Sequence, residues 1–123
     1  MRHVVTDADT AAVVGSGDVP VLATPRLIAW LEAATVRAAA PFTEPGQTTV
    51  GTEVRIQHVR ATPVGGRVEV SAEPAASVTG GRLTFAVRAV DGSGQLVASG
   101  EIDRAVVDRQ RFLARTPHPA ADR

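Results

Sequence analysis

The stretch TPRLIAWLEAATVRAAA, residues 24–40, decides the fold of this 123-residue chain. Thr24 suits the N-cap position, Pro25 suits the first helical position and Pro41 ends the run, so the sequence predicts one long helix. Nearly every other residue in the stretch is apolar or small. Because a helix that is apolar on almost every side has to be buried, we expect a sheet to wrap around it.

Charged residues mark two sides of this predicted helix. At about 100° per residue, Arg26 and Arg37 fall on one narrow stripe that we expect to face solvent, with Trp30 and Ala33 beside it. Glu32 lies about a third of a turn away from that stripe. We therefore expect the Glu32 carboxylate to point away from the solvent-facing side.

Beyond Pro41, apolar and polar residues alternate along four segments, which is typical of half-buried strands. The sets expected to face inward are Val50, Thr52, Val54, Ile56 and His58; Val68, Val70 and Ala72; Leu83, Phe85, Val87 and Ala89; and Leu96, Ala98, Gly100, Ile102, Arg104 and Val106. Gly-Gly pairs at 65–66 and 80–81 separate the first three segments, and DGSG at 91–94 is the strongest hairpin signal. A short extended piece at residues 3–5 and a brief helix through Val14 come before the long helix.

Consecutive strands joined by tight turns form an antiparallel sheet, and here that sheet has to cover a single helix. We therefore predict an α+β hot-dog fold, in which a curved antiparallel sheet of about five strands wraps one long central helix. A cone-shaped α+β barrel is the alternative, but it needs more than one substantial helix. The domain is expected to span residues 1–113, and residues 114–123 to form a disordered tail.

Composition removes several kinds of chemistry. The chain has thirteen basic and thirteen acidic residues, all of the basic ones are arginine, and Cys, Lys and Tyr are absent. These counts exclude thiolate catalysis, Schiff-base chemistry and cysteine-ligated metals, and the zero net charge gives no sign of nucleic-acid binding. The first twenty residues lack an unbroken apolar run, and no segment approaches the ~20 apolar residues of a membrane span. We expect a cytoplasmic protein without a membrane partner.

Three polar residues, Glu32, His58 and Arg104, occupy positions where the pattern predicts apolar ones. Each has an ordinary structural interpretation: a core histidine, a buried Glu–Arg pair, and an arginine that reaches solvent from a strand end. Together they favour a site, because ionised groups are costly to bury without mutual pairing and a Glu beside a His is a usable acid–base pair. Metal binding is a weaker hypothesis, since only two ligands converge and no His-x-x-x-His pattern occurs, so we expect no metal and no cofactor.

Gly51 interrupts a run of β-branched residues at 48–52. A glycine in such a run marks a bulge or a close approach of the backbone. The structural interpretation is a bulge that curves the sheet around the helix. The functional interpretation is an exposed N–H group that binds a developing oxyanion.

The sequence resembles the fluoroacetyl-CoA thioesterase family of hot-dog proteins. The resemblance covers roughly residues 2 to 113 and includes the spacing from Thr24 through Glu32 to His58. The matching segments, in order, are VLATP at 21–25, LEAATVR at 31–37, AP at 40–41, EPG at 44–46, VGT at 50–52, HVRATPVG at 58–65 and RAVV at 104–107.

This resemblance implies hydrolysis of an acyl-CoA substrate, with Thr24, Glu32 and His58 as the catalytic residues. It places Gly51 at the thioester carbonyl and Arg104 near the site, both as substrate-binding residues. The fluoroacetate-specific member has phenylalanines in its N-terminal lid, whereas residues 6–20 contain no aromatic residue here, which argues against fluoroacetyl specificity. Two other hypotheses stay open: a non-catalytic hot-dog module that binds acyl-CoA or a small ligand, and a hot-dog dehydratase.

Two geometric expectations complete the prediction. Thr24 and Glu32 are ~12 Å apart along an ideal helix, so either Thr24 folds toward the site or the substrate lies between the two groups. A five-stranded sheet around one helix leaves an open sheet edge and an uncovered apolar helix surface. We therefore expect a homodimer or a higher oligomer.

Overall fold

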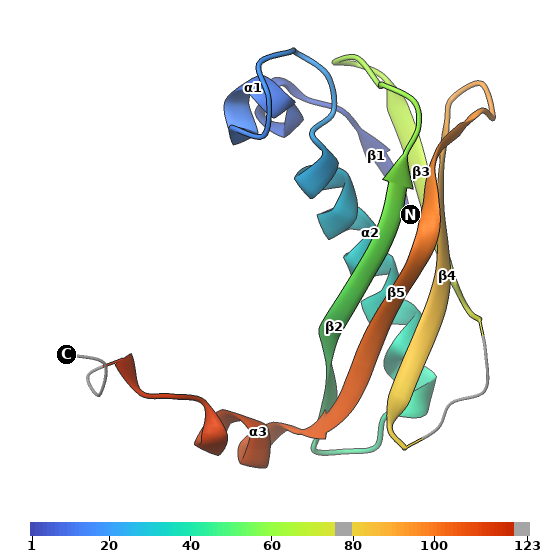
Figure 1. Ribbon diagram of the computed structural model, residues 1–123. Coiled ribbons are helices and arrows are strands. Elements are labelled where there is room, and N and C mark those ends of the chain that lie inside the picture. Colours follow the sequence, from blue (N-terminus) through green and yellow to red (C-terminus); the bar gives the residue numbers. More distant parts are fainter. Residues whose placement is uncertain (76–79, 120–123) are drawn as a thin grey trace.

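A computed structural model describes residues 1–75 and 80–119, so residues 120–123 of the predicted tail lie outside the described part. Figure 1 shows one long helix beside a tall, curled sheet. The elements in chain order are β1 (Arg2–Val4), η1 (Asp7–Asp9), α1 (Ala11–Val14), α2 (Thr24–Ala39), η2 (Ala40–Phe42), β2 (Gln47–His58), β3 (Arg67–Pro74), β4 (Arg82–Asp91), β5 (Leu96–Asp108) and α3 (Arg109–Arg115).

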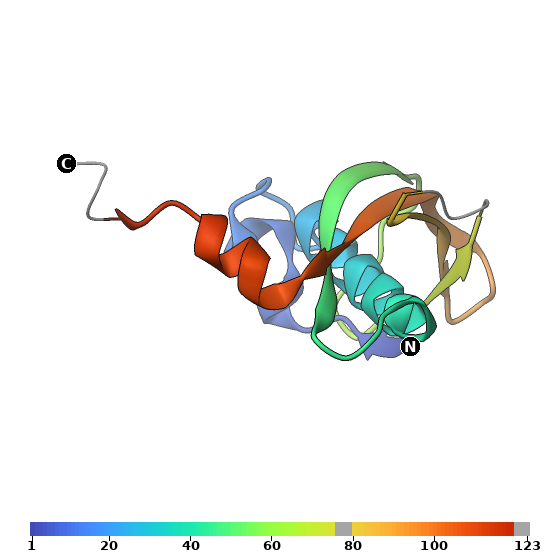
Figure 2. The ribbon, with the colours of Figure 1, turned by 90° about the horizontal axis from the view of Figure 1, so that it is seen from below.

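The five strands form one antiparallel sheet in the order β1-β3-β4-β5-β2. Seen from below, the sheet curls around α2 (Figure 2). This arrangement confirms the predicted hot-dog fold. The longest strand, β5, lies between β4 and β2, and β2 forms one edge of the sheet.

The core lies between α2 and the concave face of the sheet. Leu27 and Leu31 of α2 are fully buried there against the inward residues of the strands, of which Phe85 is the largest. The alternation predicted for β3 and β4 is confirmed, since Val68, Val70, Leu83, Val87 and Ala89 are all buried. Burial of each large apolar side chain contributes ~1.5–3 kcal/mol, so this face anchors the helix on the sheet.

The predicted capping of the long helix is wrong by one residue. Ala23 is the N-cap, Thr24 is the first helical residue and Pro25 the second, and the helix ends at Ala39 rather than at residue 40. Pro25 has no N–H group, and at this position an unpaired donor would be an orphan in any case. Because Thr24 is not used as a cap, its hydroxyl group is left for another partner.

The predicted facing of the first half of β2 is also wrong. The register between β2 and β5 shifts between Gly51 and Glu53, which is a β-bulge, and a bulge inverts the facing of every residue before it. Thr49 and Gly51 therefore face the helix, in place of Val50 and Thr52. Beyond the bulge the prediction holds, and His58 faces inward opposite the buried Ala98.

The expected arginine stripe on α2 forms in part, since Arg37 is exposed and the Arg26 side chain is 42% exposed. Arg26 is half-buried and pairs with Asp9 at 3.3 Å, which ties η1 to the start of the helix. Trp30 is partly buried and stacks on His3, with the ring centroids 4.2 Å apart. Val36 lies next to Arg37 on the exposed side of the helix, and this side faces away from the sheet.

The chain beyond β5 contains a helix that the sequence analysis did not predict. Asp108 caps α3 by accepting a hydrogen bond from the Arg111 N–H group. In both views α3 extends away from the body of the molecule (Figures 1 and 2). Phe112 and Leu113 on α3 are 42% and 60% exposed, so the described part of the chain leaves the apolar surface of this helix uncovered.

Candidate active site

The first pair of candidate site residues joins the start of α2 to the end of β2. The Thr24 hydroxyl group lies 2.7 Å from His58 Nδ1. Thr24 can make this contact because it belongs to the first turn of α2 and its hydroxyl group caps nothing. In the tautomer that carries its proton on Nε2, His58 accepts the hydroxyl proton, which is the arrangement a general base requires.

His58 is a partly buried imidazole. Burial lowers its pKa below the ordinary value, and the backbone of Arg60 acts weakly in the opposite direction. Nε2 is buried and has no hydrogen-bond partner among the described residues. A lowered pKa keeps the ring neutral at pH 7, and a neutral ring can accept a proton.

The second functional cluster lies farther along α2 and gathers around Gly51. A Cβ atom placed on Gly51 would lie 2.7 Å from Glu32 Oε2 and 3.5 Å from Arg104 Nη1. The strand bulges at this glycine, and the backbone closely approaches a charged group, whereas the oxyanion-binding N–H group stays a prediction. The Glu32 side chain is 38% exposed, so it is less buried than the sequence predicted.

Arg104 is buried on β5 and does not reach solvent from a strand end. Its Nε donates to Thr49 Oγ1 at 2.9 Å, and its Nη2 donates to the Thr49 carbonyl oxygen at 3.1 Å. Nη1 lies 3.8 Å from Glu32 Oε2 and 3.5 Å from Thr35 Oγ1. Desolvation lowers the pKa of Arg104, and the charge of Glu32 opposes this shift. Hydrogen bonds to Thr49 fix the guanidinium group, and its positive charge attracts the Glu32 carboxylate.

Thr35 and Thr49 complete this second cluster, and the sequence analysis did not identify either of them. Thr49 was missed because its facing depends on the bulge, and Thr35 because an uncharged residue in a helix that is apolar on almost every side carries no signal of a site. Thr35 is fully buried and also donates to the Glu32 carbonyl oxygen at 2.6 Å. A bulge assigned to Gly51 from the sequence would have indicated Thr49 as an inward-facing residue.

The two clusters do not meet within one chain. Thr24 contacts His58, and Glu32 contacts Arg104, but no contact between Glu32 and His58 occurs in the described structure. The eight-residue separation of Thr24 and Glu32 along α2 corresponds to ~12 Å. The expectation of a Glu–His pair is therefore not met inside a single copy.

A hollow of about 340 Å³ opens beside the first pair, and we call it the active-site hollow. Thr24 and His58 lie on its wall with aliphatic residues from both sides, among them Val19 from the segment after α1. That segment is held down by β-bridge pairing of Thr10 with Leu22. The hollow can take a small organic group next to the Thr24–His58 pair.

Comparison with known proteins identifies the family. A model of the fluoroacetyl-CoA-specific thioesterase family matches residues 5–110. The fluoroacetyl-CoA thioesterase of Streptantibioticus cattleyicolor is 42% identical over 95 residues, which make up 77% of this chain and 67% of that protein. The chain belongs to the fluoroacetyl-CoA-specific thioesterase family.

Solved structures agree with this assignment. A structure of the fluoroacetyl-CoA thioesterase FlK has a TM-score of 0.83 at 36% identity, with 95% of this chain and 93% of that chain covered. A Thermus thermophilus protein of the thioesterase superfamily has a TM-score of 0.85 at 28% identity, with 93% and 83% covered. Membership in the fluoroacetyl-CoA-specific thioesterase family confirms the predicted enzyme class and fold.

Two further findings concern metal ligands and membrane-spanning helices. Within residues 1–75 and 80–119, no group of three or more metal-ligating side chains comes together. Over the same residues, none of the helices has the length and apolar character needed to span a membrane. The candidate site residues lie in two groups, Thr24 with His58, and Glu32 with Gly51 and Arg104.

Proposed function

We propose that the protein hydrolyses an acyl-CoA thioester to a free acid and coenzyme A. The observation that carries the proposal is the 2.7 Å contact between Thr24 and His58 at an accessible hollow, in a member of a thioesterase family. The catalytic domain is taken as residues 1–113. A cytoplasmic location, where coenzyme A thioesters are made and used, belongs to the same proposal.

The reaction assigns a role to each residue. A nucleophilic oxygen, either of water or of the Glu32 or Thr24 side chain, bonds to the thioester carbonyl carbon, and the carbon–sulfur bond then breaks. In the second case the acyl group stays on the side chain until water hydrolyses this acyl-enzyme to the free acid. Glu32 acts as base or nucleophile, and His58 carries the proton that the departing thiolate takes up. Thr24 orients the substrate or attacks it. The Gly51 N–H group, at the break in the strand ladder, donates to the oxyanion.

Arg104 has a positioning role in this scheme. The guanidinium group is buried and bonded to Thr49, so it contacts the reacting atoms only through Glu32. Its own positive charge lies behind the Glu32 carboxylate and keeps that carboxylate against Gly51. This proposed role differs from the substrate-binding role that the resemblance implies, which stays a prediction.

We propose that two copies of the chain complete the site. β2 is an edge strand of twelve residues, and an open edge of this length is a template for pairing. Antiparallel pairing of two β2 strands about a two-fold axis brings the His58 end of one copy alongside the half of the partner strand that carries Gly51. Glu32 of one copy then lies near Thr24 and His58 of the other, which removes the ~12 Å separation.

Hydrolysis is tested directly with a panel of acyl-CoA thioesters, including fluoroacetyl, short aliphatic and aryl examples, and a dye that traps free thiol. We expect thiol release that depends on enzyme concentration. Tight binding of the thioesters without thiol release would instead support a non-catalytic binding module. Loss of water from a 3-hydroxyacyl-CoA, followed by its enoyl absorbance, would support the dehydratase.

A further inference from the structure

A line of three hollows leads from the active site to a group of arginines. The active-site hollow shares Arg60 and Ala61 with a second hollow of about 440 Å³ between the 59–66 loop and the β4–β5 hairpin. The second hollow shares Arg67, Asp91 and Gly92 with a third of about 310 Å³ on the outer side of β1 and β3. We call the second and third hollows together the arginine groove.

Arg60 stands where the active-site hollow opens into the arginine groove. Among the described residues that line the active-site hollow, it alone carries a full charge. Its Nε lies 3.0 Å from Asp91 Oδ2, and neither Nη group has a partner in the described part of the chain. The Arg60 N–H group bonds to the Val97 carbonyl oxygen at 3.3 Å, which fixes the backbone two residues beyond His58.

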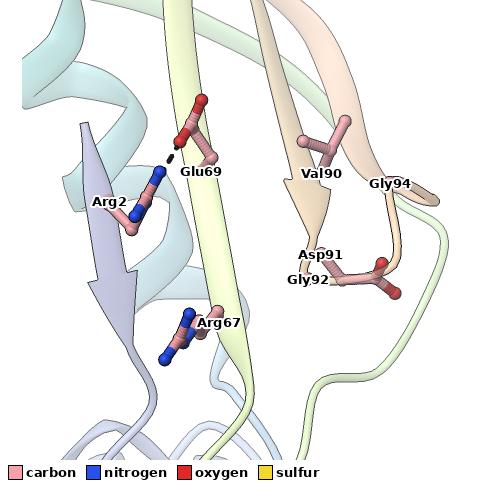
Figure 3. Close-up of a pocket in the computed structure, with 7 residues that line it drawn as sticks. All are labelled: Arg2, Arg67, Glu69, Val90, Asp91, Gly92 and Gly94. Atoms are coloured by element: carbon pink, nitrogen blue, oxygen red, sulfur yellow. Dashed lines mark hydrogen bonds and ion pairs between the residues drawn. The ribbon is translucent and has the colours of Figure 1, made fainter.

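Arg67 lies on the same groove at the start of β3. Figure 3 shows it near Arg2, which is joined to Glu69 by an ion pair, whereas Arg67 itself has no such link to a residue drawn there. Over residues 1–75 and 80–119, no carboxylate lies within 4.0 Å of the Arg67 guanidinium. Arg67 therefore offers an uncompensated positive charge, while Arg2 is neutralised.

Asp91 is the one acid that lines both hollows of the groove, and its oxygens are already occupied. Its Oδ1 accepts hydrogen bonds from the N–H and hydroxyl groups of Ser93 and from the Gln95 N–H group, and its Oδ2 accepts from Arg60. These bonds, that of the Ser93 hydroxyl first, lower the pKa of Asp91 to about 2. Asp91 thus holds Arg60 through Nε, and both Nη groups of Arg60 keep no partner among the described residues.

We infer that Arg60 and Arg67 bind the phosphate groups of the coenzyme A nucleotide. This inference rests on the proposed function, which places the thioester sulfur beside Thr24 and His58 and requires the rest of the coenzyme to leave the hollow. The arginine groove begins at the wall of that hollow. Guanidinium groups bind phosphate oxygens through paired, charge-assisted hydrogen bonds, and the nucleotide half of coenzyme A carries a diphosphate and a 3′-phosphate.

The test compares three thioesters with the same acyl group, made from coenzyme A, from 3′-dephospho-coenzyme A and from N-acetylcysteamine, which lacks the nucleotide. We expect Arg60→Ala and Arg67→Ala each to raise KM for the coenzyme A thioester about 10-fold, with little change in kcat. KM for the N-acetylcysteamine thioester should stay near the wild-type value in both variants. Arg88→Ala is the matched control, because Arg88 is an exposed arginine in the middle of β4.

The dephospho substrate identifies the phosphate involved. If the variants still raise its KM, the diphosphate is bound, and if the effect disappears, the 3′-phosphate is bound; both results support the groove. A rise in KM that is equal for all three thioesters would overturn the inference, since it would mean a damaged active site. Unchanged kinetics with the coenzyme A thioester in the variant that combines Arg60→Ala and Arg67→Ala would also overturn the inference.

Binding without turnover separates this inference from the proposed function. Calorimetric titration of wild-type protein with free coenzyme A should give an affinity that falls about 10-fold or more in each variant and not in Arg88→Ala. Failure of the wild-type protein to cleave any thioester, together with arginine-dependent coenzyme A binding, would contradict hydrolysis and support the groove. Cleavage of a thioester, together with coenzyme A binding that does not depend on the arginines, would support hydrolysis and contradict the groove.

Discussion

Glu32 is the residue on which the hydrolytic scheme depends most, and its surroundings separate catalysis from stability. Its carboxylate lies 3.8 Å from Arg104 and its side chain is 38% exposed. A partly exposed pair of this kind contributes about 0.2–1 kcal/mol, and Arg104 keeps its bonds to Thr49 without it. We expect Glu32→Gln to change the free energy of unfolding by less than about 1 kcal/mol and to lower kcat ~10²-fold or more.

A thermal melt and a thioester hydrolysis assay on the same Glu32→Gln protein check both parts. Turnover at the wild-type rate would remove Glu32 from the mechanism. A loss of several kcal/mol would make Glu32 a structural partner of Arg104. The size of the side chain is kept, so altered packing does not explain either result.

Gly51 has no room for a side chain on the helix-facing side of β2. An added Cβ would lie 2.7 Å from Glu32 Oε2, and the carboxylate is the flexible end of a long side chain that can move away. We therefore expect Gly51→Ala to fold normally and to lower kcat about 10²-fold by displacing Glu32. Thr52→Ala, at the neighbouring exposed position, should keep wild-type turnover in the same assay.

At the scale of the elements, pairing of β2 with β5 is what places Gly51 and His58. Gly100 on β5 lies opposite Ile56, and a Cβ there would lie only 1.9 Å from the Arg55 carbonyl oxygen. That oxygen belongs to the backbone and cannot move unless the two strands separate. We expect Gly100→Ala to cost about 3 kcal/mol or more, measured by denaturant unfolding.

Gly92→Ala provides the comparison for Gly100→Ala. A Cβ at Gly92 would lie 3.8 Å from the Arg67 Cβ, which is an ordinary contact, and the backbone of Gly92 is not in the left-handed region. Its unfolding free energy should stay within about 1 kcal/mol of wild type. Equal stability of the two variants would mean that the close approach of Gly100 to the Arg55 backbone is not needed for the pairing of β2 with β5.

Local patterns predicted most of the elements, and the exceptions have physical causes. The hot-dog fold follows from one apolar helix and from alternating segments with Gly-rich turns, because those signals are local. The facing of Thr49 and Gly51 could not be read from alternation, since one inserted residue inverts it. The contact of Thr24 with His58 could not be predicted from local patterns, because it depends on a one-residue shift of the helix start and on how α2 lies against the end of β2.

The separation of the two site clusters was anticipated only as a distance along the helix. Residue types and spacing indicated Glu32, His58 and Arg104 as polar residues on inward faces. They could not indicate which pairs meet, because that depends on the twist of the sheet and on the copy of the chain that supplies each side chain. Arg60 was not indicated at all, since a single arginine after a strand is an ordinary surface residue.

At the scale of the whole molecule, two partly buried imidazoles make stability depend on pH. Burial is the largest cause that lowers the pKa of His3 and of His58, so the unfolded chain takes up protons near pH 6.5 before the folded chain does. Their stabilisation is complete above that value and is lost as the pH falls through the lower folded pKa values. We expect a lower Tm at pH 5.5 than at pH 7.5.

Asp91 and Asp103, whose pKa values are lowered, do not contribute to this pH window. The pKa of Asp91 lies at about 2, and that of Asp103 is also lowered, first by its hydrogen bond to Arg55, so their contributions change only in more acidic solution. His3→Gln should reduce the difference in Tm between pH 7.5 and 5.5. A difference that stays the same in this variant and in His58→Gln would mean that other groups control it.

The assembly determines whether the two site clusters work together, and mixed dimers test this. Glu32→Gln and His58→Ala should each be nearly inactive alone. If each site takes Thr24 and His58 from one copy and Glu32 from the other, a dimer of one variant of each kind contains one intact site. In a random mixture half of the dimers are of this kind, so about a quarter of the wild-type activity should return.

The same mixture distinguishes the alternatives without further variants. If every site were built within one chain, each chain would lack one catalytic group and no activity would return on mixing. If the protein were monomeric, sedimentation would give a mass near 12.8 kDa and mixing would again have no effect. Recovery that follows the fraction of mixed dimers therefore requires both the pairing and the exchange of Glu32 between copies, because neither variant carries a complete set of groups.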